Sequence, residues 1–294
     1  MKVSVVIINY NTFTLTSDCI RSVINYTRGA DYEIILVDNN SSECDADKFL
    51  IEFPGITIVK SPSNNGFARG NNLGIEQASG EMILLLNSDT YLTEDSISKT
   101  AEFFKQQSSA GVVGCRMTYP DGTIQYTARR FRSISWELLD LFRFIPLLMP
   151  YKKRSRIMLG KYFRHDENTI CDWLNGAFFL FSKKILEHLP GGKLDERFFM
   201  YGEDQLWCEQ VKKLGHTNHF YSGTTIIHIS SGSTDLSKQL RLRNTMMKHE
   251  LEIMKERKGR GVYMAIFRLI YTGKEKSRNL VKSLYYKMTG KLIR

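Results

Sequence analysis

Two adjacent acidic residues in the second half of the chain have the features of a general base. Glu203 and Asp204 stand in a segment rich in aromatic residues, namely Phe198, Phe199, Tyr201 and Trp207. Apolar surroundings and a neighbouring like charge both raise the pKa of a carboxyl group, which suits proton abstraction near neutral pH. An ordinary helix start is the alternative, because acidic residues are favoured in the first turn of a helix.

Polar side chains follow three apolar segments of the first half. These clusters are Asn9-Tyr10-Asn11, Asp38-Asn39-Asn40-Ser41-Ser42 and Asn87-Ser88-Asp89. Each cluster taken alone is also compatible with an ordinary turn. Asp38 can accept a hydrogen bond from a pyrimidine base or a ribose hydroxyl. Asp89 can offer a carboxylate to a hard divalent cation that also binds substrate phosphates. We therefore expect a binding cleft for a nucleotide.

The elements that would position these residues alternate between strand and helix. Continuous apolar runs predict strands over residues 3–8, 32–37, 56–59, 82–86 and 112–115. Helical patterns cover residues 15–26, 45–53, 68–78 and 95–107. Such runs indicate parallel strands buried on both faces, and this order predicts an open, doubly wound α/β sheet. Ligands of these sheets bind at the carboxyl ends of the strands, where the three clusters lie. A hairpin turn is predicted over residues 119–123.

The composition excludes several classes of protein. Of the 294 residues, 42% are hydrophobic and 24% are charged, so neither a disordered nor a fibrous chain fits. The five cysteines have no metal-ligand spacing, and no apolar signal segment follows Met1. We expect reduced thiols in a cytoplasmic protein. No apolar stretch approaches the ~20 residues of a membrane span.

The net charge of +10 is distributed unevenly. Residues 129–164 carry a net charge of +8, residues 248–294 carry +9, and the remainder carries −7. Nucleic acid and an anionic membrane surface are the two partners that basic segments suggest. Ordinary solvated faces are the third explanation.

Two common nucleotide-binding motifs are absent from the sequence. The turn after the first strand reads Asn9-Tyr10-Asn11-Thr12 and contains no glycine, so the dinucleotide fingerprint fails. No G-x-x-x-x-G-K-[ST] motif occurs either. A nucleotide would therefore be held without a glycine-rich phosphate loop.

Five ordered motifs resemble the inverting family-2 glycosyltransferases of the GT-A fold, the rhamnosyltransferase-like branch in particular. They read VSVVIINYN, IILVDNNSS, NNGFARGNNLGI, GEMILLLNSD and DERFFMYGEDQLWCEQVKKLG, and the similarity spans about residues 3–230. The resemblance implies a catalytic domain over residues 1–235, with a mostly parallel sheet. Residues 1–115 would bind the nucleotide sugar, and residues 116–235 would form a small α+β acceptor half that contains a basic amphipathic insertion at 129–164. A basic helical extension, in contact with a membrane surface or a second subunit, would follow over 236–294.

The resemblance also implies the residues of the donor site. Those at matching positions are Asn9, Asn11 and Asp38 for the base and ribose, Gly66, Gly70 and Asn71 in the sugar-nucleotide loop, and Asn87, Ser88 and Asp89 in the family's DxD element. The first Asp of that element is Asn87 here, which leaves Asp89 as the expected ligand of Mg²⁺ or Mn²⁺. His228 matches a late histidine that often completes the metal site, and a structural histidine at a strand end is its alternative.

The matching positions on the acceptor side complete the expected mechanism. The family uses the second acid of the pair as the base, so Asp204 would deprotonate the acceptor, and Glu203 would orient either Asp204 or the acceptor. Trp173, Asn175 and Gly176 match the acceptor side, with Trp173 as a surface for sugar stacking. The sugar would move in one displacement that inverts the anomeric carbon.

The branch suggests L-rhamnose from dTDP-rhamnose as the transferred sugar, with a UDP- or GDP-sugar as the alternative donor. The expected acceptor is a lipid-linked glycan in the synthesis of a cell-envelope polysaccharide such as O-antigen. From other classes, a basic nucleic-acid-binding protein and a non-catalytic sugar-binding relative stay open, although no nucleic-acid partner is expected. The chain keeps both acidic motifs that a sugar-binding relative would have lost.

We expect the enzyme to lie peripherally on the inner face of the plasma membrane. Both basic segments interleave cations with apolar residues, as interfacial segments do. These residues are Trp136, Leu138, Leu139, Phe142, Phe144, Leu147 and Leu148 in one segment, and Val262, Tyr263, Ile266, Phe267, Leu269, Ile270, Tyr285 and Tyr286 in the other. Packing of the tail on the catalytic body or in a homodimer is the alternative.

Overall fold

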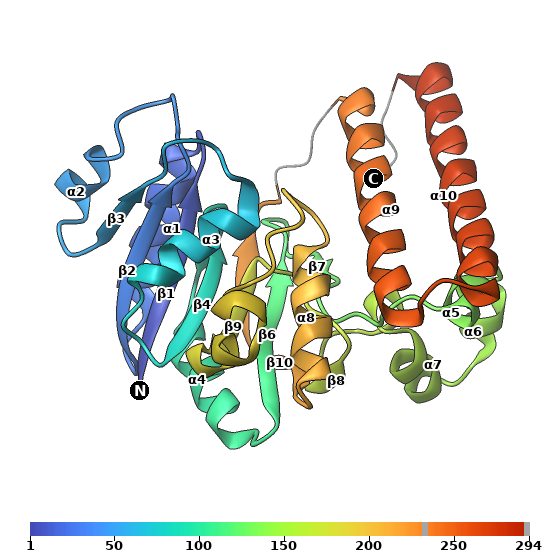
Figure 1. Ribbon diagram of the computed structural model, residues 1–294, viewed down its shortest axis with the longest axis horizontal. Helices are drawn as coiled ribbons and strands as arrows, with labels where there is room; N and C mark the ends of the chain where they lie inside the picture. Colours follow the sequence, from blue (N-terminus) through green and yellow to red (C-terminus); the bar gives the residue numbers. More distant parts are fainter. Residues whose placement is uncertain (231–234, 291–294) are drawn as a thin grey trace. The chain divides into compact units, whose positions relative to one another are not determined.

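The computed structural model describes residues 1–230 and 235–290. Residues 231–234 of the predicted catalytic domain and residues 291–294 of the predicted extension lie outside this description. The chain divides into two compact units (Figure 1). Unit 1 comprises Met1–Arg130 and Leu159–Ser230, and unit 2 comprises Phe131–Met158 and Ser231–Arg294. Most of the predicted insertion at 129–164 therefore groups with the C-terminal helices.

Unit 1 is built on one sheet whose main strand order is β3-β2-β1-β4-β9-β6-β10-β5. The strands are β1 (Lys2–Asn9), β2 (Asp31–Asp38), β3 (Thr57–Lys60), β4 (Met82–Asn87), β5 (Thr90–Leu92), β6 (Ala110–Thr118), β7 (Ile124–Gln125), β8 (Thr169–Cys171), β9 (Phe178–Ser182) and β10 (Thr217–His228). The ladders among β3, β2, β1 and β4 are parallel, as is the β6–β10 ladder, while β9 runs antiparallel between β4 and β6. The predicted α/β class with a mostly parallel sheet is confirmed.

The helices of unit 1 are α1 (Phe13–Tyr26), α2 (Lys48–Glu52), α3 (Gly66–Gln77), α4 (Ser96–Gln106) and α8 (Glu203–Lys213), with short 3₁₀ turns η1 (Gly160–Tyr162), η2 (Lys183–His188) and η3 (Pro190–Gly192). The predicted helix over residues 45–53 was too long, because α2 begins only at Lys48. The Asp45 carboxylate accepts from the Asp47 amide at 3.1 Å, and this local turn competes with helix formation. The predicted hairpin turn is present, since the Tyr119 amide donates to the Thr123 carbonyl.

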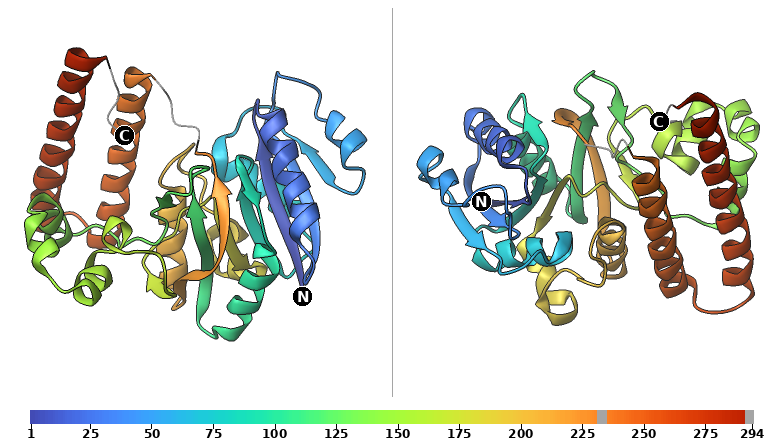
Figure 2. Two further views of the ribbon diagram at one scale, coloured as in Figure 1. Left: turned by 180° about the vertical axis from the view of Figure 1, so that it is seen from behind. Right: turned by 90° about the horizontal axis from the view of Figure 1, so that it is seen from above.

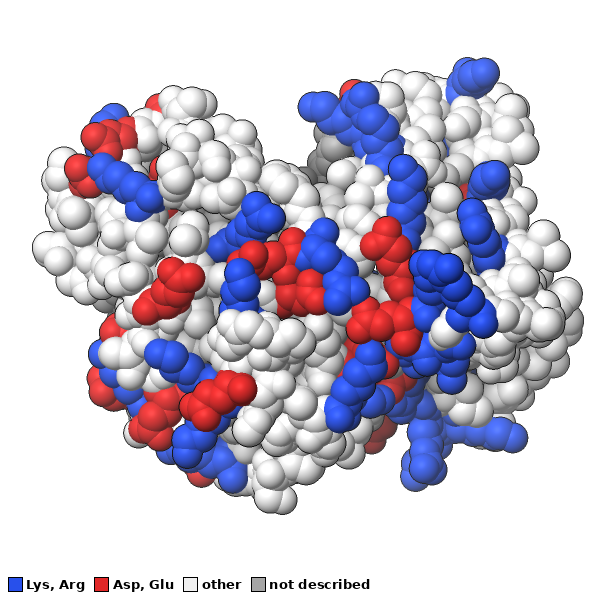
Figure 3. Space-filling view, viewed as in Figure 1, with Lys and Arg blue, Asp and Glu red and all other residues white. Residues whose placement is uncertain are grey.

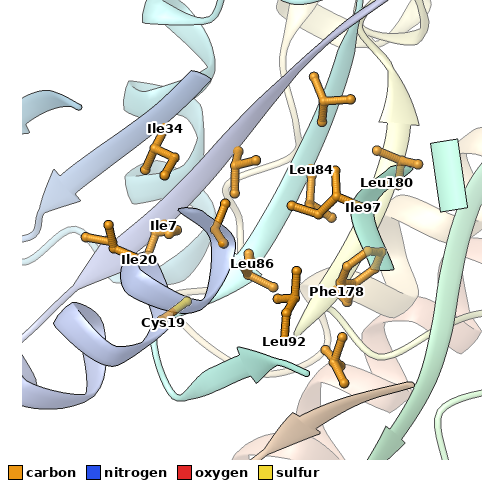
Figure 4. Packing of buried hydrophobic residues seen from close by; sticks show 14 of the residues in the cluster. Ile7, Cys19, Ile20, Ile34, Leu84, Leu86, Leu92, Ile97, Phe178 and Leu180 are labelled. Atoms are coloured by element: carbon orange, nitrogen blue, oxygen red, sulfur yellow. The ribbon is translucent and has the colours of Figure 1, made fainter. Parts of the chain in front are cut away.

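Alternating side chains of the central strands bury both faces of the sheet. On one face, Ile7 of β1 and Leu84 of β4 pack with Ile20 of α1 (Figure 4). On the other face lies α3, whose glycines allow a close approach (Figure 2). A Cβ at Gly74 would lie 2.4 Å from Val6 Cγ1, so this position leaves no room for a side chain.

The register of the strands brings the three predicted polar clusters together. Asn9 is the partner of Asp38 in the β1–β2 ladder, and Ile8 is the partner of Asn87 in the β1–β4 ladder. The carboxyl ends of three parallel strands thus lie at one edge of the sheet. This edge is where ligands of open α/β sheets bind.

Unit 2 is helical and contains α5 (Ile134–Leu141), α6 (Phe144–Leu148), α7 (Tyr151–Met158), α9 (Leu236–Lys258) and α10 (Val262–Thr289). The long helices α9 and α10 lie side by side (Figures 1 and 2). Met254, Phe267 and Tyr271 form its core. Phe267 was predicted to be exposed for membrane contact, and that prediction is wrong because its side chain is fully buried in this core.

Buried ion pairs connect α5 to α10 inside unit 2. The Lys274 ammonium pairs with the carboxylates of Glu137 and Asp140, and all three side chains are almost completely buried. Arg278 also pairs with Asp140, at 2.8 Å. Breaking a buried pair leaves an uncompensated charge, which is costly, so these contacts fix the position of α5 on α10.

Gly66 offers a test of how α3 is held. Its φ is +75°, and a Cβ there would lie 2.2 Å from the Phe199 carbonyl oxygen. The matched control is Gly122, whose φ is +81° and where a Cβ would have no heavy atom within 4 Å. Gly122→Ala should lower the free energy of unfolding by about 1 kcal/mol, and Gly66→Ala by about 1–3 kcal/mol more. Equal losses in urea denaturation would contradict the close contact.

Candidate active site

The first two strand ends form a buried hydrogen-bond network. The Asn9 amide nitrogen donates to Asp38 Oδ1 and to Ser41 Oγ, both at 2.9 Å. Its oxygen accepts from the hydroxyls of Thr12 and Thr16. Asn9 is only 1% exposed, so its amide binds protein groups on both sides. Asn9 therefore holds the Asp38 carboxylate in place at the strand end.

The residues after β1 hold the loop that follows β2. Asn11 has a φ of 53°, and its side-chain oxygen accepts from the amides of Ser42 and Glu43 at 2.8 and 3.1 Å. The ring of Tyr10 is 47% exposed beside it. Tyr10 was not among the predicted site residues, yet it places a flat aromatic face at the same edge as Asp38.

The segment that leads into α3 is held by polar clamps. The Asn39 amide donates to Asn64 Oδ1 and to the Gly66 carbonyl. Two of the predicted donor residues lie in the packed interior of unit 1. Gly70 faces Ile8, and Asn71, 1% exposed, donates to the Phe67 carbonyl at 3.0 Å.

The predicted metal ligands Asp89 and His228 are brought together. Asp89 Oδ1 lies 3.2 Å from His228 Nε2, and His228 pairs with Thr90 in the β5–β10 ladder. Ser88 lies close by, with its hydroxyl 3.4 Å from that of Thr12. Asn87 takes part through its backbone, because its main-chain amide donates a hydrogen bond to the Ala177 carbonyl.

The surroundings of His228 decide which ring nitrogen faces Asp89 with a lone pair. Gln125 Nε2 donates to the His228 carbonyl, which leaves Gln125 Oε1 to accept a proton from His228 Nδ1 at 2.8 Å. In this tautomer Nε2 points a lone pair toward the Asp89 carboxylate, an arrangement that a cation bound between the two groups would satisfy. A ligating histidine whose other nitrogen donates to a carbonyl is a common metal-site arrangement.

This pair fits a divalent cation that also binds substrate oxygens. Within residues 1–230 and 235–290, no third Cys, His, Asp or Glu joins Asp89 and His228 in a cluster. Two protein ligands leave most coordination positions for phosphate oxygens and water, as Mg²⁺ sites commonly do. The donor set present is therefore compatible with the predicted metal.

The acidic pair stands at the first turn of α8, after a sharp bend. Tyr201 and Gly202 both have positive φ, 70° and 97°, and they direct the chain into the helix at Glu203. Glu203 is 6% exposed, and its Oε2 has no hydrogen-bond partner within the described chain. Burial, and then the negative charge of Asp204, raise the pKa of Glu203 to about 8.

Asp204 has a different environment from Glu203. Its side chain is half-buried, Oδ1 accepts from the Gln205 amide at 2.8 Å, and Oδ2 accepts from the Gly176 amide at 3.2 Å. Burial raises the pKa of Asp204, and the two amides and the positive charge of Arg129 limit that rise. Near neutral pH the pair thus holds a protonated Glu203 beside an Asp204 whose charged form is stabilised by hydrogen bonds.

The predicted aromatic surroundings are confirmed in part. Phe198 and Trp207, on either side of the acidic pair in the sequence, are buried at 3% and 0% exposure, as expected. Phe199 is 56% exposed instead, and its carbonyl accepts from the Phe67 amide at 2.8 Å. This bond ties the segment before α8 to the first turn of α3.

The predicted acceptor residues lie next to Asp204. Gly176 donates to that carboxylate, and the Asn175 side chain accepts from the Ala177 amide at 2.9 Å. Trp173 is half-buried, with its indole nitrogen donating to the Arg130 carbonyl. The Arg129 guanidinium lies 5.1 Å from the Trp173 ring centroid, so one face of the predicted stacking surface already carries a cation.

Besides Tyr10, sequence reasoning missed three contributors to the site. Gln125 orients His228 across 103 residues of sequence, and no local pattern marks it. Arg129 was recognised only as one of many basic residues, although its charge acts on Asp204. Asn72 clamps α3 to the segment before α8 through the Leu194 backbone. The repeated Asn residues of the NNGFARGNNLGI motif were the available signal for Asn72.

Comparison with known proteins agrees with this fold. Residues 4–189 match the family described as "Glycosyl transferase family 2". The O-antigen biosynthesis protein RfbC of Myxococcus xanthus is 27% identical over 79% of this chain, which spans 18% of that protein's length. The N-acetylglucosaminyl-diphospho-decaprenol L-rhamnosyltransferase of Mycobacterium tuberculosis is 22% identical over 68% of this chain and 67% of its own length.

Among solved structures, the mannosyltransferase PcManGT from Pyrobaculum calidifontis, in complex with GDP-Man and Mn²⁺, has a similar fold. The TM-score is 0.61 at 14% identity, over 99% of this chain and 76% of the other. The chain therefore has the GT-A fold. The chain belongs to glycosyl transferase family 2.

Glu203 predicts a pH dependence of stability. Its pKa is raised from the usual 4.5 to about 8, so between these values the folded protein keeps a proton that the unfolded chain has released. The free energy of unfolding should therefore fall as the pH rises from about 5 to about 8. Glu203→Gln cannot ionise and should show a shallower fall in urea denaturation at a series of pH values. A slope equal to that of the wild type would contradict the raised pKa.

Proposed function

We propose that this enzyme transfers L-rhamnose from dTDP-rhamnose to a lipid-linked glycan, with inversion and with the help of Mg²⁺ or Mn²⁺. The observation that carries the proposal is the arrangement around residues 175–177. The Gly176 amide binds the carboxylate of Asp204, and the Ala177 carbonyl binds the amide of Asn87, two residues before Asp89. A base and a metal-binding carboxylate therefore flank one short segment.

The environments of the two acids support Asp204 as the base. A protonated Glu203 cannot accept a proton, and it places no second negative charge beside Asp204. Asp204 would remove the proton from an acceptor hydroxyl as that oxygen attacks the anomeric carbon. The diphosphate leaves from the opposite face, so the configuration inverts in a single step.

Asp89 and His228 would hold the divalent cation together with the donor diphosphate. When bound, the cation supplies electrostatic stabilisation for the charge that develops on the leaving diphosphate. Asp38 would accept a hydrogen bond from the base or ribose, and Asn9 keeps its carboxylate oriented. The exposed ring of Tyr10 would stack on the base.

The donor and acceptor are inferred from relatives. The mycobacterial relative is named for rhamnosyl transfer to a diphospho-decaprenol carrier, and the Myxococcus relative for O-antigen biosynthesis. These names support rhamnose and a lipid-linked polysaccharide precursor. A UDP- or GDP-sugar is the alternative donor. Thermal-shift assays with the three nucleotide sugars separate the candidates, because a donor at 100 times its Kd stabilises the protein by about 2.7 kcal/mol.

The role of the base is tested by Asp204→Asn, which keeps the shape of the side chain. Turnover should fall by roughly 10²–10⁴ while donor binding, measured by calorimetry, stays within about twofold of the wild type. The matched control is Asp31→Asn, an exposed acid at the opposite end of β2, which should keep full turnover. Asp204→Asn turnover within threefold of the wild type would exclude this base.

The metal site is tested by binding rather than by activity alone. Asp89→Asn removes an anionic oxygen and should weaken Mn²⁺ binding in the presence of a nucleoside diphosphate by about tenfold or more, measured by electron paramagnetic resonance. Asp45→Asn, in an exposed loop of unit 1, is the control and should bind Mn²⁺ normally. Unchanged Mn²⁺ affinity in Asp89→Asn would overturn the assignment.

We also propose that unit 2 attaches the enzyme to an anionic membrane surface. No helix of the described residues has the length and apolar character needed to cross a bilayer. The residues of units 1 and 2 carry net charges of −5 and +15, and Lys and Arg gather over unit 2 in Figure 3. We call the exposed apolar residues of α5, α6 and the intervening loop the apolar ridge: Leu138, Leu141, Phe142, Phe144, Ile145, Leu147 and Leu148.

The apolar ridge and the basic helix α7 together suit an interfacial position. Leu148 is 83% exposed, and Lys152, Lys153 and Arg156 are exposed just beyond it. Interfacial segments bury such side chains shallowly while their cations meet anionic lipid, at about 1 kcal/mol per cation. Of the predicted tail residues, Val262, Ile266 and Leu269 are exposed as well.

Point substitutions test the membrane attachment, because α10 supplies Phe267 and Tyr271 to the core of unit 2 and its deletion would remove that core. Leu147→Ser combined with Leu148→Ser should lower binding to anionic vesicles by about tenfold or more, because a buried leucine contributes about 1.5–3 kcal/mol. The control is Ile51→Ser, an 85% exposed residue of α2 in unit 1. Equal vesicle co-sedimentation of all three proteins would contradict the role of the apolar ridge.

A further inference from the structure

Unit 2 contains a surface groove beside the turn that joins α9 to α10. Its volume is about 650 Å³. Three cations line it, Lys255 from α9, Arg260 from the turn and Arg268 from α10, and no Asp or Glu does. The rest of its wall is largely apolar, with Met264, Ala265 and Leu269 along one side of α10. We call it the α9–α10 groove.

The cations of this groove differ from those inside unit 2. Three cations inside unit 2, Lys274, Arg132 and Arg278, form ion pairs with carboxylates. Their partners are Glu137, Asp140, Glu250 and Glu275. In the part of the chain that the structure describes, Lys255, Arg260 and Arg268 form no ion pair with a carboxylate. These four acids are thus used internally, while Glu252 and Glu256 are exposed on α9, and the three cations of the groove stay available to an external anion.

The groove combines this positive charge with exposed apolar surface. Leu269, which lines the groove together with Arg260 and Arg268, is 75% exposed. A small inorganic anion would use the cations and leave the apolar wall uncovered. An amphipathic anion, with a phosphate next to hydrocarbon, would satisfy both parts at once.

We propose that the α9–α10 groove binds the phosphate of an anionic phospholipid headgroup, with Met264, Ala265 and Leu269 against the adjoining hydrocarbon. The proposal deepens the membrane attachment proposed for unit 2 and rests on it for its biological setting. The apolar ridge would supply insertion, and the groove would supply recognition of the headgroup. Lys255, Arg260 and Arg268 would donate to the phosphate oxygens, with arginine able to donate two parallel hydrogen bonds.

Charge complementarity favours a lipid over the other possible occupants. A nucleic acid would match the cations of the groove but not its apolar wall. A second copy of the chain could offer carboxylates from its acidic unit 1 or from the exposed Glu252 and Glu256 of α9, and sedimentation equilibrium tests that occupant. A negatively charged lipid surface matches both the groove and the +15 charge of the residues in unit 2.

The first measurement uses a soluble lipid and the complete chain. Dihexanoyl phosphatidylglycerol, kept below its micelle concentration, is titrated into protein with labelled methionine methyl groups. The Met264 methyl resonance should shift saturably, while that of Met117, buried in the core of unit 1, should not move. Dihexanoyl phosphatidylcholine and inorganic phosphate are the comparison ligands, and each should need at least tenfold higher concentration for the same shift.

The second measurement separates the groove from the overall charge. One variant combines Lys255→Gln, Arg260→Gln and Arg268→Gln, and its matched control combines Lys238→Gln, Lys276→Gln and Lys287→Gln, which removes three exposed cations elsewhere on α9 and α10. Attraction by net charge alone would weaken vesicle binding equally in both. The proposal predicts that the groove variant loses at least tenfold more affinity for phosphatidylglycerol vesicles than the control does.

Each outcome bears on the proposal. Three results would overturn it. The first is an equal loss of vesicle affinity in the two variants, and the second is an equal response of the Met264 resonance to inorganic phosphate. The third is a wild-type dimer that the groove variant converts to monomer in sedimentation equilibrium. Wild-type protein that ignores phosphatidylglycerol vesicles but shows the saturable, lipid-specific Met264 shift would support the groove and contradict membrane attachment. In a further outcome, the wild type binds vesicles normally, the ridge substitutions lower that binding, and the groove substitutions lower it no more than the control does. This outcome would support membrane attachment and overturn the proposed headgroup site.

Discussion

The candidate site depends on a short segment, residues 175–177, that hydrogen-bonds to both halves of unit 1. Its Ala177 carbonyl accepts from Asn87 at the end of β4, and its Gly176 amide donates to Asp204 in the first turn of α8. A Cβ at Gly176 would lie 3.3 Å from Asp204 Cβ, so the close approach leaves little room for a side chain. The strand end of the first half and the acid of the second half are thus connected through this segment by one main-chain hydrogen bond and by one hydrogen bond from the main chain to the Asp204 carboxylate.

Environment, rather than residue type, gives the two acids different roles. Glu203 is buried, one of its oxygens has no hydrogen-bond partner among the residues that the structure describes, and the pKa of its carboxyl is raised to about 8. Asp204 shares the helix start but accepts two main-chain hydrogen bonds. Burial raises the pKa of both carboxyl groups, but only Asp204 has main-chain hydrogen bonds that favour its charged form, and such a difference in environment can give paired carboxyl groups separate functions. Environment also distinguishes the charged groups of unit 2. Glu137, Asp140, Glu250 and Glu275 form internal ion pairs, while the cations of the α9–α10 groove remain at the surface.

The sequence alone was sufficient to predict features that arise from local residue patterns or from a pattern that recurs along the chain. Apolar runs predicted β1, β2 and β4, and parallel pairing then places Asn9, Asp38 and Asn87 at one edge. Features that depend on distant contacts were not predictable in this way. Gln125 reaches His228 across 103 residues, and Lys274 reaches Asp140 across 134. No periodicity marks such pairs, so Phe267 was assigned to a membrane face when it is part of a core. The helix expected over residues 45–53 was shortened by a side-chain turn at Asp45, a competition that hydrophobic periodicity does not register.

The central claim is that the strand-end edge and Asp204 carry out one direct, inverting displacement. The most direct test is the anomeric configuration of the sugar at the moment of its transfer. Proton NMR can follow the first-formed anomer when the enzyme, Mn²⁺ and the nucleotide sugar that stabilises it react with an acceptor or, slowly, with water. The account predicts that the first product has the configuration opposite to that of the donor. A first product with the donor's own configuration would contradict it.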